Sequence, residues 1–191
     1  MGVFILNSVL LGIGLAMDAF SVSLANGLAE HSVSRRKACL EAVVFGAFQA
    51  AMPLAGWLCV HTLIGIFGVL EKAVPWVALV LLCFIGGKML FEGIKKGDGE
   101  QAAALSAGEL VIQGVATSID ALSVGFTTAS YGFAEALFSA IIIAAVTFVI
   151  CLAGVYIGKK AGTRLANKAS VLGGSILIII GIEIFIKGIL Q

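Results

Sequence analysis

The chain has 191 residues, of which 60% are hydrophobic and 12% are charged, whereas a soluble domain carries about twice that charged fraction. Its 12 basic and 11 acidic residues nearly cancel, so the chain offers no basic surface for nucleic acid. The mean hydropathy is +1.12, and the apolar residues form long blocks without the spacing of an amphipathic soluble helix. These features predict an all-α polytopic membrane protein that lies in the lipid bilayer.

Six apolar segments reach the length of about 20 residues that a helix needs to cross a bilayer. They are 3–27, 40–61, 73–94, 108–129, 134–157 and 170–190. We expect the first to be a retained transmembrane helix and not a signal peptide, because it lacks a basic start, is interrupted by Asp18 and continues too far. We therefore expect a single transmembrane domain over 1–191, with six helices and a hydrophilic linker at 98–107.

Lysines and arginines are concentrated on one side of the expected membrane. The loops after the first, third and fifth segments hold nine of them: Arg35, Arg36, Lys37, Lys95, Lys96, Lys159, Lys160, Arg164 and Lys168. The other side has Lys72 and, near the C-terminal end, Lys187. Because basic loops stay in the cytoplasm, both termini are expected on the outer side.

The two halves of the chain resemble each other. The sequence LAMDAFS at 15–21 is related to TSIDALS at 117–123, which places Asp18 and Asp120 in equivalent positions. Two shorter stretches also recur: LAGW at 54–57 as LAGV at 152–155, and FIG at 84–86 as IIG at 179–181. Three helices per repeat is an odd number, so the second repeat would cross the membrane upside down. We expect two inverted three-helix repeats, at about 1–97 and 108–191.

Asp18 and Asp120 are candidate functional residues because each falls near the centre of an apolar segment. A charged residue there costs about 3 kcal/mol on insertion scales, so each carboxylate is expected to face a cavity, a ligand or the other. The alternative is a protonated carboxyl that is hydrogen-bonded across a helix interface. On helical spacing, Asp18 shares a face with Ser21, and Asp120 shares a polar face with Gln113, Thr117, Ser123 and Thr127.

Gln49 is expected to contribute a third donor. Pro53 has no N–H to give to the carbonyl of residue 49, so Gln49 would present both an amide side chain and a freed carbonyl. The alternative is a simple kink that a neighbouring hydroxyl satisfies. The equivalent position in the second half is Thr147, which is not followed by proline.

Together these residues form an all-oxygen donor set: Asp18, Asp120, Gln49, Ser21, Thr117 and Ser123. Such a set suits divalent ions such as manganese, magnesium and calcium. Hydroxyls in membrane helices usually bond to their own backbone, which weakens the case for the serines and the threonine. Met17 and Met52 lie close in sequence to these donors, and a thioether ligand would favour manganese.

Two further pairs of opposite charge occur in the third and sixth segments, four residues apart in each. They are Lys88 with Glu92 and Glu183 with Lys187. The simpler interpretation is two pairs whose long side chains reach toward the membrane surface. The alternative is that Glu183 helps to move a coupling proton.

The chain resembles the MntP family of bacterial manganese efflux pumps, which belongs to a superfamily of lysine-exporter-like transporters. The resemblance covers the chain from about Leu10 to its end and rests on MDAF at 17–20, FGAFQ at 45–49, PLAGW at 53–57, GGKM at 86–89, EG at 92–93 and ATSIDA at 116–121. It implies six helices in the cytoplasmic (inner) membrane and export of manganese(II) that depends on Asp18 and Asp120. Some members have a glutamate where this chain has Gln49.

We therefore expect a secondary transporter, not an enzyme, that exports manganese in exchange for protons and needs no cofactor. The sequence has no nucleotide-binding motif such as a P-loop. An exporter of another small solute, such as an amino acid, is the nearest alternative, although no midplane cation is present to bind a carboxylate. A membrane electron relay is a third, but it would need cysteine pairs where this chain has Asp18 and Asp120.

Overall fold

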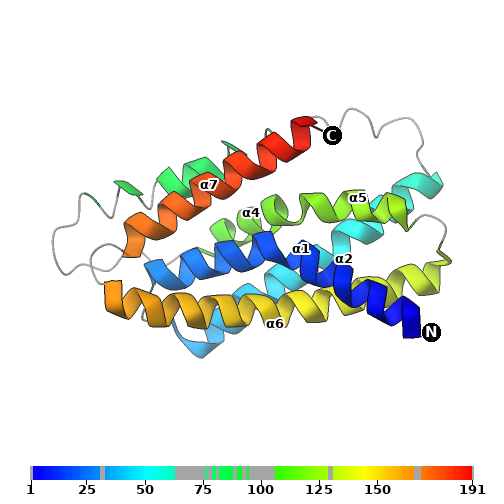
Figure 1. The fold of residues 1–191 in the computed structure, drawn as a ribbon, viewed down its shortest axis with the longest axis horizontal. Helices are drawn as coiled ribbons and strands as arrows, with labels where there is room; N and C mark the ends of the chain where they lie inside the picture. The colour runs from blue at the N-terminus through cyan, green and yellow to red at the C-terminus, as the bar shows by residue number, and fades with distance from the viewer. Residues whose placement is uncertain are drawn as a thin grey trace.

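The structure, a computed structural model, describes residues 2–30, 33–62, 76, 79–80, 82–87, 90–91, 94, 106–128, 131–165 and 169–190. Every regular element in this part of the chain is a helix, which agrees with the predicted fold class. Figure 1 shows α1 (Gly2–Ala29), α2 (Arg35–Thr62), α4 (Ala107–Thr117), α5 (Ile119–Thr127), α6 (Phe133–Leu165) and α7 (Ala169–Leu190).

Four of the predicted segments each correspond to one continuous helix. They are 3–27, 40–61, 134–157 and 170–190, which fall within α1, α2, α6 and α7. Segment 73–94 is only partly described, and its described residues are helical. The third of the six predicted membrane-crossing helices therefore lies partly outside the described residues.

We expected segment 108–129 to form one continuous helix, but the structure divides it into two. The helix α4 ends at Thr117, Ser118 forms a turn with φ −108° and ψ 7°, and α5 begins at Ile119. The Ser118 N–H donates to the Val115 carbonyl at 3.2 Å. This bond spans three residues, as in a 3₁₀ turn, and is typical of a helix end. The Ser118 hydroxyl also donates to the Gly114 carbonyl at 2.7 Å. The break therefore falls inside the related phrase that contains Asp120.

The start of α4 is fixed by a capping box. The Ser106 hydroxyl accepts a hydrogen bond from the Glu109 N–H at 3.2 Å, and the Glu109 carboxylate accepts one from the Ser106 N–H at 2.8 Å. This reciprocal pair satisfies two backbone donors that a helix leaves open at its start.

Glycines allow the helices to approach closely, as is common in membrane bundles. A side chain at Gly27 would collide with the Val155 carbonyl of α6, and one at Gly158 with the Leu24 carbonyl of α1. At these two glycines α1 packs closely against α6, and the two helices run parallel (Figure 1).

A second set of glycine contacts joins the two halves of the chain. A side chain at Gly56 would collide with the Leu122 carbonyl, which packs α2 against α5. A side chain at Gly154 would lie 2.9 Å from the Phe20 carbonyl, which packs α6 against α1. The second half of the chain thus packs against the first through positions that the sequence comparison aligned.

The helices alternate in direction along the bundle. In Figure 1, α1 and α6 run from right to left, whereas α2, the α4–α5 pair and α7 run from left to right. Both chain ends lie toward the right of this view. Described residues of segment 73–94 lie beside α7: the Trp76 and Phe185 rings meet edge-on with centroids 4.6 Å apart, and a side chain at Gly86 would collide with the Gly174 carbonyl.

Three of the described helices are long and apolar enough to cross a membrane: Gly2–Ala29, Arg35–Cys59 and Phe133–Gly162. A shorter apolar stretch, Val171–Glu183, lies in α7. Large aliphatic side chains are exposed on the outside of the bundle, for example Val149 at 64% and Ile179 at 63%. A water-facing surface would not carry so many of them, so this chain is a multi-pass membrane protein.

Candidate metal-binding site

Gln49 joins three helices at the level of the helix break. Its amide nitrogen donates to the Leu15 carbonyl of α1 at 3.0 Å and to the Thr117 carbonyl of α4 at 3.1 Å. Gln49 is fully buried on α2. Both neighbours are acceptors, so the amide must direct its NH₂ group toward them. The side-chain oxygen Oε1 consequently faces elsewhere.

The two carbonyls that Gln49 contacts occupy equivalent places in the related phrases. Leu15 precedes Asp18 by three residues, and Thr117 precedes Asp120 by three. One amide group therefore bridges the two halves of the chain, one helical turn from each aspartate. The structure brings together the segments that carry both predicted carboxylates.

The two aspartates differ in their surroundings. Asp18 lies within α1 and is partly buried, whereas Asp120 lies in the first turn of α5 and is exposed. In an unbroken helix the Ala121 N–H would donate to the Thr117 carbonyl. Here it donates to the Asp120 carboxylate at 2.8 Å, and the Thr117 carbonyl accepts from Gln49. The break thus places a carboxylate at the positive end of α5, where a negative charge is favoured.

Two of the predicted hydroxyl donors bond to their own helix. The Ser21 hydroxyl donates to the Met17 carbonyl at 3.0 Å, and the Thr117 hydroxyl to the Gln113 carbonyl at 2.9 Å. This is the usual behaviour of hydroxyls in membrane helices. The side chain of Ser123, the third predicted hydroxyl, lies outside the described residues.

Three buried oxygens lack a hydrogen-bond partner within the described ranges: Gln49 Oε1, Ser23 Oγ and Thr147 Oγ1. All three residues are 0% exposed. A buried unpaired polar atom costs about 1–3 kcal/mol, so each needs a reason to remain. Gln49 and Thr147 occupy the positions that the sequence comparison made equivalent. The sequence indicated Gln49 as an oxygen ligand for a metal ion, but it gave no such indication for Ser23.

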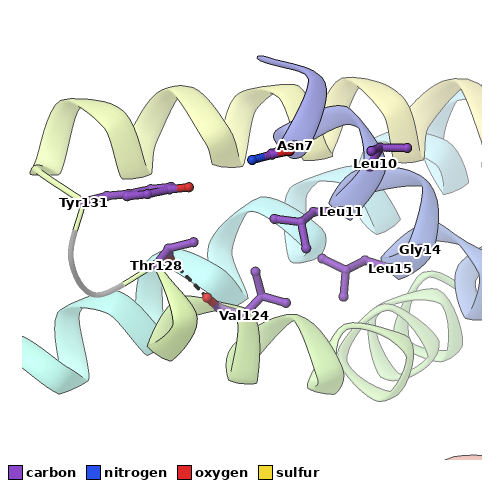
Figure 2. A pocket seen from close by; sticks show the side chains of 8 residues that line it. All are labelled: Asn7, Leu10, Leu11, Gly14, Leu15, Val124, Thr128 and Tyr131. Atoms are coloured by element: carbon purple, nitrogen blue, oxygen red, sulfur yellow. Dashed lines mark hydrogen bonds between the residues drawn. The ribbon is translucent and has the colours of Figure 1, made fainter. Parts of the chain in front are cut away.

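A cavity of about 560 Å³ opens beside this site, and we call it the Tyr131 cavity (Figure 2). Asn7, Thr128 and Tyr131 contribute its polar groups. The cavity extends to Leu15, whose carbonyl contacts Gln49, and to Val124 of α5. Leu15 is thus shared by the cavity and the Gln49 bridge, whereas Gln49, Asp18 and Asp120 are not among the residues that line the cavity.

A second polar cluster lies toward the other end of α1. The sequence did not indicate that its members contact one another. Asn26 Nδ2 donates to Glu41 Oε1 at 3.0 Å and to Gln113 Oε1 at 2.8 Å, and Gln113 Nε2 donates back to Asn26 Oδ1 at 3.1 Å. These residues are at most 4% exposed. Gln113 had been placed on the polar face of its helix, but Asn26 and Glu41 had not been singled out. The available signal was a carboxylate and an amide within two apolar segments.

The predicted charge pairs can be placed only in part. Lys88, Glu92 and the side chain of Lys187 fall outside the described residues. Glu183 is exposed on α7. Whether these residues pair or move protons stays a prediction.

Within the described ranges, no group of three or more His, Cys, Asp or Glu side chains is arranged to hold a metal ion. A site at the Gln49 bridge would therefore combine carboxylate oxygens with neutral amide and carbonyl oxygens. Hard divalent cations accept such mixed oxygen ligands.

Comparison with known proteins identifies close relatives. A family model described as "Putative manganese efflux pump" matches residues 32–185. A "Putative manganese efflux pump MntP" of Clostridium perfringens (strain 13 / Type A) is 41% identical over 205 residues, covering 96% of this chain and 94% of the relative. A protein of the same name from Methanothermobacter thermautotrophicus is 40% identical over 185 residues, covering 97% of each chain. No solved structure matches.

Proposed function

This chain belongs to the family of manganese efflux pumps that the matching model describes, and on that basis we propose that it exports manganese(II) from the cytoplasm as a secondary transporter. The ion is the substrate, and its site lies at the Gln49 bridge. Asp18 and Asp120 supply the charged ligands, and Gln49 Oε1 supplies a neutral one. The predicted hydroxyl ligands are close in the chain: Ser21 follows Asp18 on α1, Thr117 ends α4, and Ser123 follows Asp120 on α5.

The observation that carries this proposal is the bridge itself. One amide group contacts the carbonyls of Leu15 and Thr117, each one turn before an aspartate, and leaves its own oxygen unpaired and buried. In many transporters, interrupted helices present helix ends and free backbone carbonyls to ions near the bilayer midplane. A divalent ion that binds Gln49 Oε1 would remove the cost of leaving that oxygen unpaired.

Two inverted three-helix repeats fit the arrangement of the helices. The first helix of each half packs on the second helix of the other half, through Gly56 on Leu122 and Gly154 on Phe20. The related helices α1 and α4–α5 run in opposite directions, as do α2 and α6 (Figure 1). Both features are expected of inverted repeats that share a site at their interface.

Proton exchange follows from the chemistry of the ligands. Two carboxylates balance the charge of one divalent ion, and protonation of both would remove its binding site. Inward movement of protons could then drive the ion outward without nucleotide hydrolysis. If the basic loops lie in the cytoplasm, the Tyr131 cavity faces the outer side and provides the path of release.

Manganese tolerance of a bacterial strain that lacks its own exporter tests this function. The wild-type chain should restore growth in manganese, whereas Asp18→Asn and Asp120→Asn should not, at equal amounts of membrane-inserted protein. Asp98→Asn is the matched control, because Asp98 lies in the hydrophilic linker and is the remaining aspartate of the chain. Full tolerance with either Asp18→Asn or Asp120→Asn would contradict the ligand assignment.

A further inference from the structure

The two halves of α1 differ in how this helix meets the α4–α5 pair. On the C-terminal side of Asp18, Asn26 of α1 and Gln113 of α4 exchange two hydrogen bonds, at 2.8 and 3.1 Å, and both side chains are at most 2% exposed. On the N-terminal side of Asp18, the Tyr131 cavity of about 560 Å³ lies between α1 and α5. The described helices are therefore joined across the bundle on one side of Asp18 and parted by a cavity on the other.

The internal repeat relates these two places residue by residue. The offset of 102 residues that aligns the two aspartates (120 − 18) also aligns Asn26 with Thr128 and Leu11 with Gln113. Leu11 and Thr128 both line the Tyr131 cavity, Leu11 from α1 and Thr128 from the turn after α5 (Figure 2). The same pair of positions is therefore hydrogen-bonded at one end of the bundle and lines a cavity at the other.

Close contacts group four helices into two equivalent pairs. Glycine contacts pack α6 on α1 at Gly154 and α2 on α5 at Gly56. The pairs also meet each other, because a side chain at Gly46 of α2 would lie 3.0 Å from the Ala144 carbonyl of α6. The offset of 98 residues that aligns LAGW with LAGV (152 − 54) aligns Gly46 with Ala144 as well. A contact between equivalent residues lies on the axis that relates two repeats, and this is the axis about which one repeat tilts against the other in transporters.

We propose that Asn26 and Gln113 form the cytoplasmic gate of the transport cycle and that Leu11 and Thr128 form the outer gate. The structure is the state in which the cytoplasmic gate is closed. In the opposite state Leu11 packs against Thr128, the Tyr131 cavity closes, and the two amides separate to admit the ion from the cytoplasm. This proposal rests on the proposed function, since it needs the inverted repeats and the orientation that the basic loops predict.

Water can replace the hydrogen bonds of the cytoplasmic gate when this gate opens. A pocket of about 210 Å³ reaches Asn26 and is also lined by Glu41 and by Lys37 at the basic start of α2. Asn26 Nδ2 donates to Glu41 Oε1 at 3.0 Å as well as to Gln113. Hydrogen bonds that are exchanged for bonds to water change the free energy little, so a polar gate of this kind can close fully and still reopen.

Reaction of an introduced cysteine with a membrane-impermeant maleimide tests the proposal on the full-length chain in the membrane. Gly14 lines the Tyr131 cavity, and a side chain there meets no atom within 4 Å, so Gly14→Cys reports whether the outer gate is open. The reporter is placed in a chain whose native cysteines are changed to alanine: Cys39, Cys59, Cys83 and Cys151. Without manganese, it should react at least about tenfold faster in intact cells than from the cytoplasmic face of inverted vesicles.

Asn26→Ala should slow this reaction in intact cells by about fivefold or more. The substitution leaves Gln113 and Glu41 without a partner that they have only while the cytoplasmic gate is closed, so the population shifts toward the state with the outer gate closed. Ser8→Ala is the matched control, because it removes a buried hydrogen bond of 3.1 Å from Ser8 of α1 to Ser139 of α6. That bond lies within one pair of helices, so the reaction rate should stay unchanged.

Leu11→Gln combined with Thr128→Asn gives a result even if Asn26→Ala does not fold, because it leaves the cytoplasmic gate intact. It copies the amide pair to the outer gate and should slow the reaction by about twofold or more, since the closed outer gate gains hydrogen bonds. An unchanged rate in a folded Asn26→Ala protein or in this double variant, or a faster reaction from the cytoplasmic face, would overturn the proposal. No manganese is present, so these rates test the gates alone, whereas manganese sensitivity of cells with the wild-type chain would count against the proposed function.

Discussion

Gln49→Leu is expected to stop manganese export while lowering the stability of the fold only slightly. Leucine fills a similar volume but has no polar atom. It removes the two hydrogen bonds to the Leu15 and Thr117 carbonyls, and it also removes the buried oxygen that has no partner within the described chain.

The effects on stability largely offset one another. The Thr117 carbonyl, whose intrahelical donor Ala121 N–H is turned to Asp120, loses the Gln49 amide at a cost of about 1–3 kcal/mol, and removal of the unpaired Gln49 Oε1 returns about 1–3 kcal/mol. The lost bond to the Leu15 carbonyl, which lies within the continuous helix α1, contributes about 0.5–1.5 kcal/mol. The free energy of unfolding should therefore fall by about 1 kcal/mol, which corresponds to roughly 2–4 °C in Tm for a chain of this size. Export should nevertheless fall, because the neutral ligand and the bridge between the halves are both lost.

Thermal unfolding of the purified variant and manganese efflux from cells measure the two effects separately. Gln113→Leu is the contrasting variant, because both ends of the Gln113 amide are paired with Asn26. It should lower stability by about 1–3 kcal/mol or more, since it leaves buried partners unsatisfied. A large loss of stability in Gln49→Leu would make Gln49 a structural crosslink, and wild-type export by a stable Gln49→Leu protein would refute its role in binding the ion.

Two further substitutions test the packing and the second unpaired oxygen. Gly56→Ala should destabilise the bundle and lower export, because its methyl group would collide with the Leu122 carbonyl, whereas Gly14→Ala meets no atom within 4 Å and should keep the fold; equal Tm values for the two variants would contradict this packing. Thr147→Val should raise stability by about 1 kcal/mol or more, because it removes a buried hydroxyl that has no partner in the described ranges. An unchanged or lower Tm for Thr147→Val would show that this hydroxyl is satisfied.

The sequence predicted the helices well because hydrophobic length is a strong signal in a membrane protein. It did not predict the break at Ser118, since this stretch contains no proline and its nearest glycine, Gly114, lies within α4. Two hydrogen bonds accompany the break: a local one from the Ser118 hydroxyl to the Gly114 carbonyl, and a tertiary one from Gln49 to the Thr117 carbonyl. Gln49 is 68 residues from Thr117 in the chain, so the sequence around Thr117 does not reveal this contact.

The sequence singled out only some of the groups at the candidate site, whose role in binding metal stays a prediction. The internal repeat identified Asp18 and Asp120, and the structure brings their segments to one amide group. The pairing of Asn26 with Glu41 and Gln113 was not predictable, because polar residues near the ends of apolar segments usually face the headgroups. Only the packing of α1 against α2 and α4 buries them together.

Uptake of manganese(II) into inverted membrane vesicles tests the central claim most directly, since it measures substrate and coupling in one assay. With an acidic interior, wild-type vesicles should accumulate manganese, and the accumulation should collapse when the pH gradient is dissipated. Vesicles that contain Asp18→Asn or Asp120→Asn should show neither effect, whereas Asp98→Asn vesicles should behave as wild type. Gradient-driven uptake that persists without Asp18 and Asp120 would contradict the account.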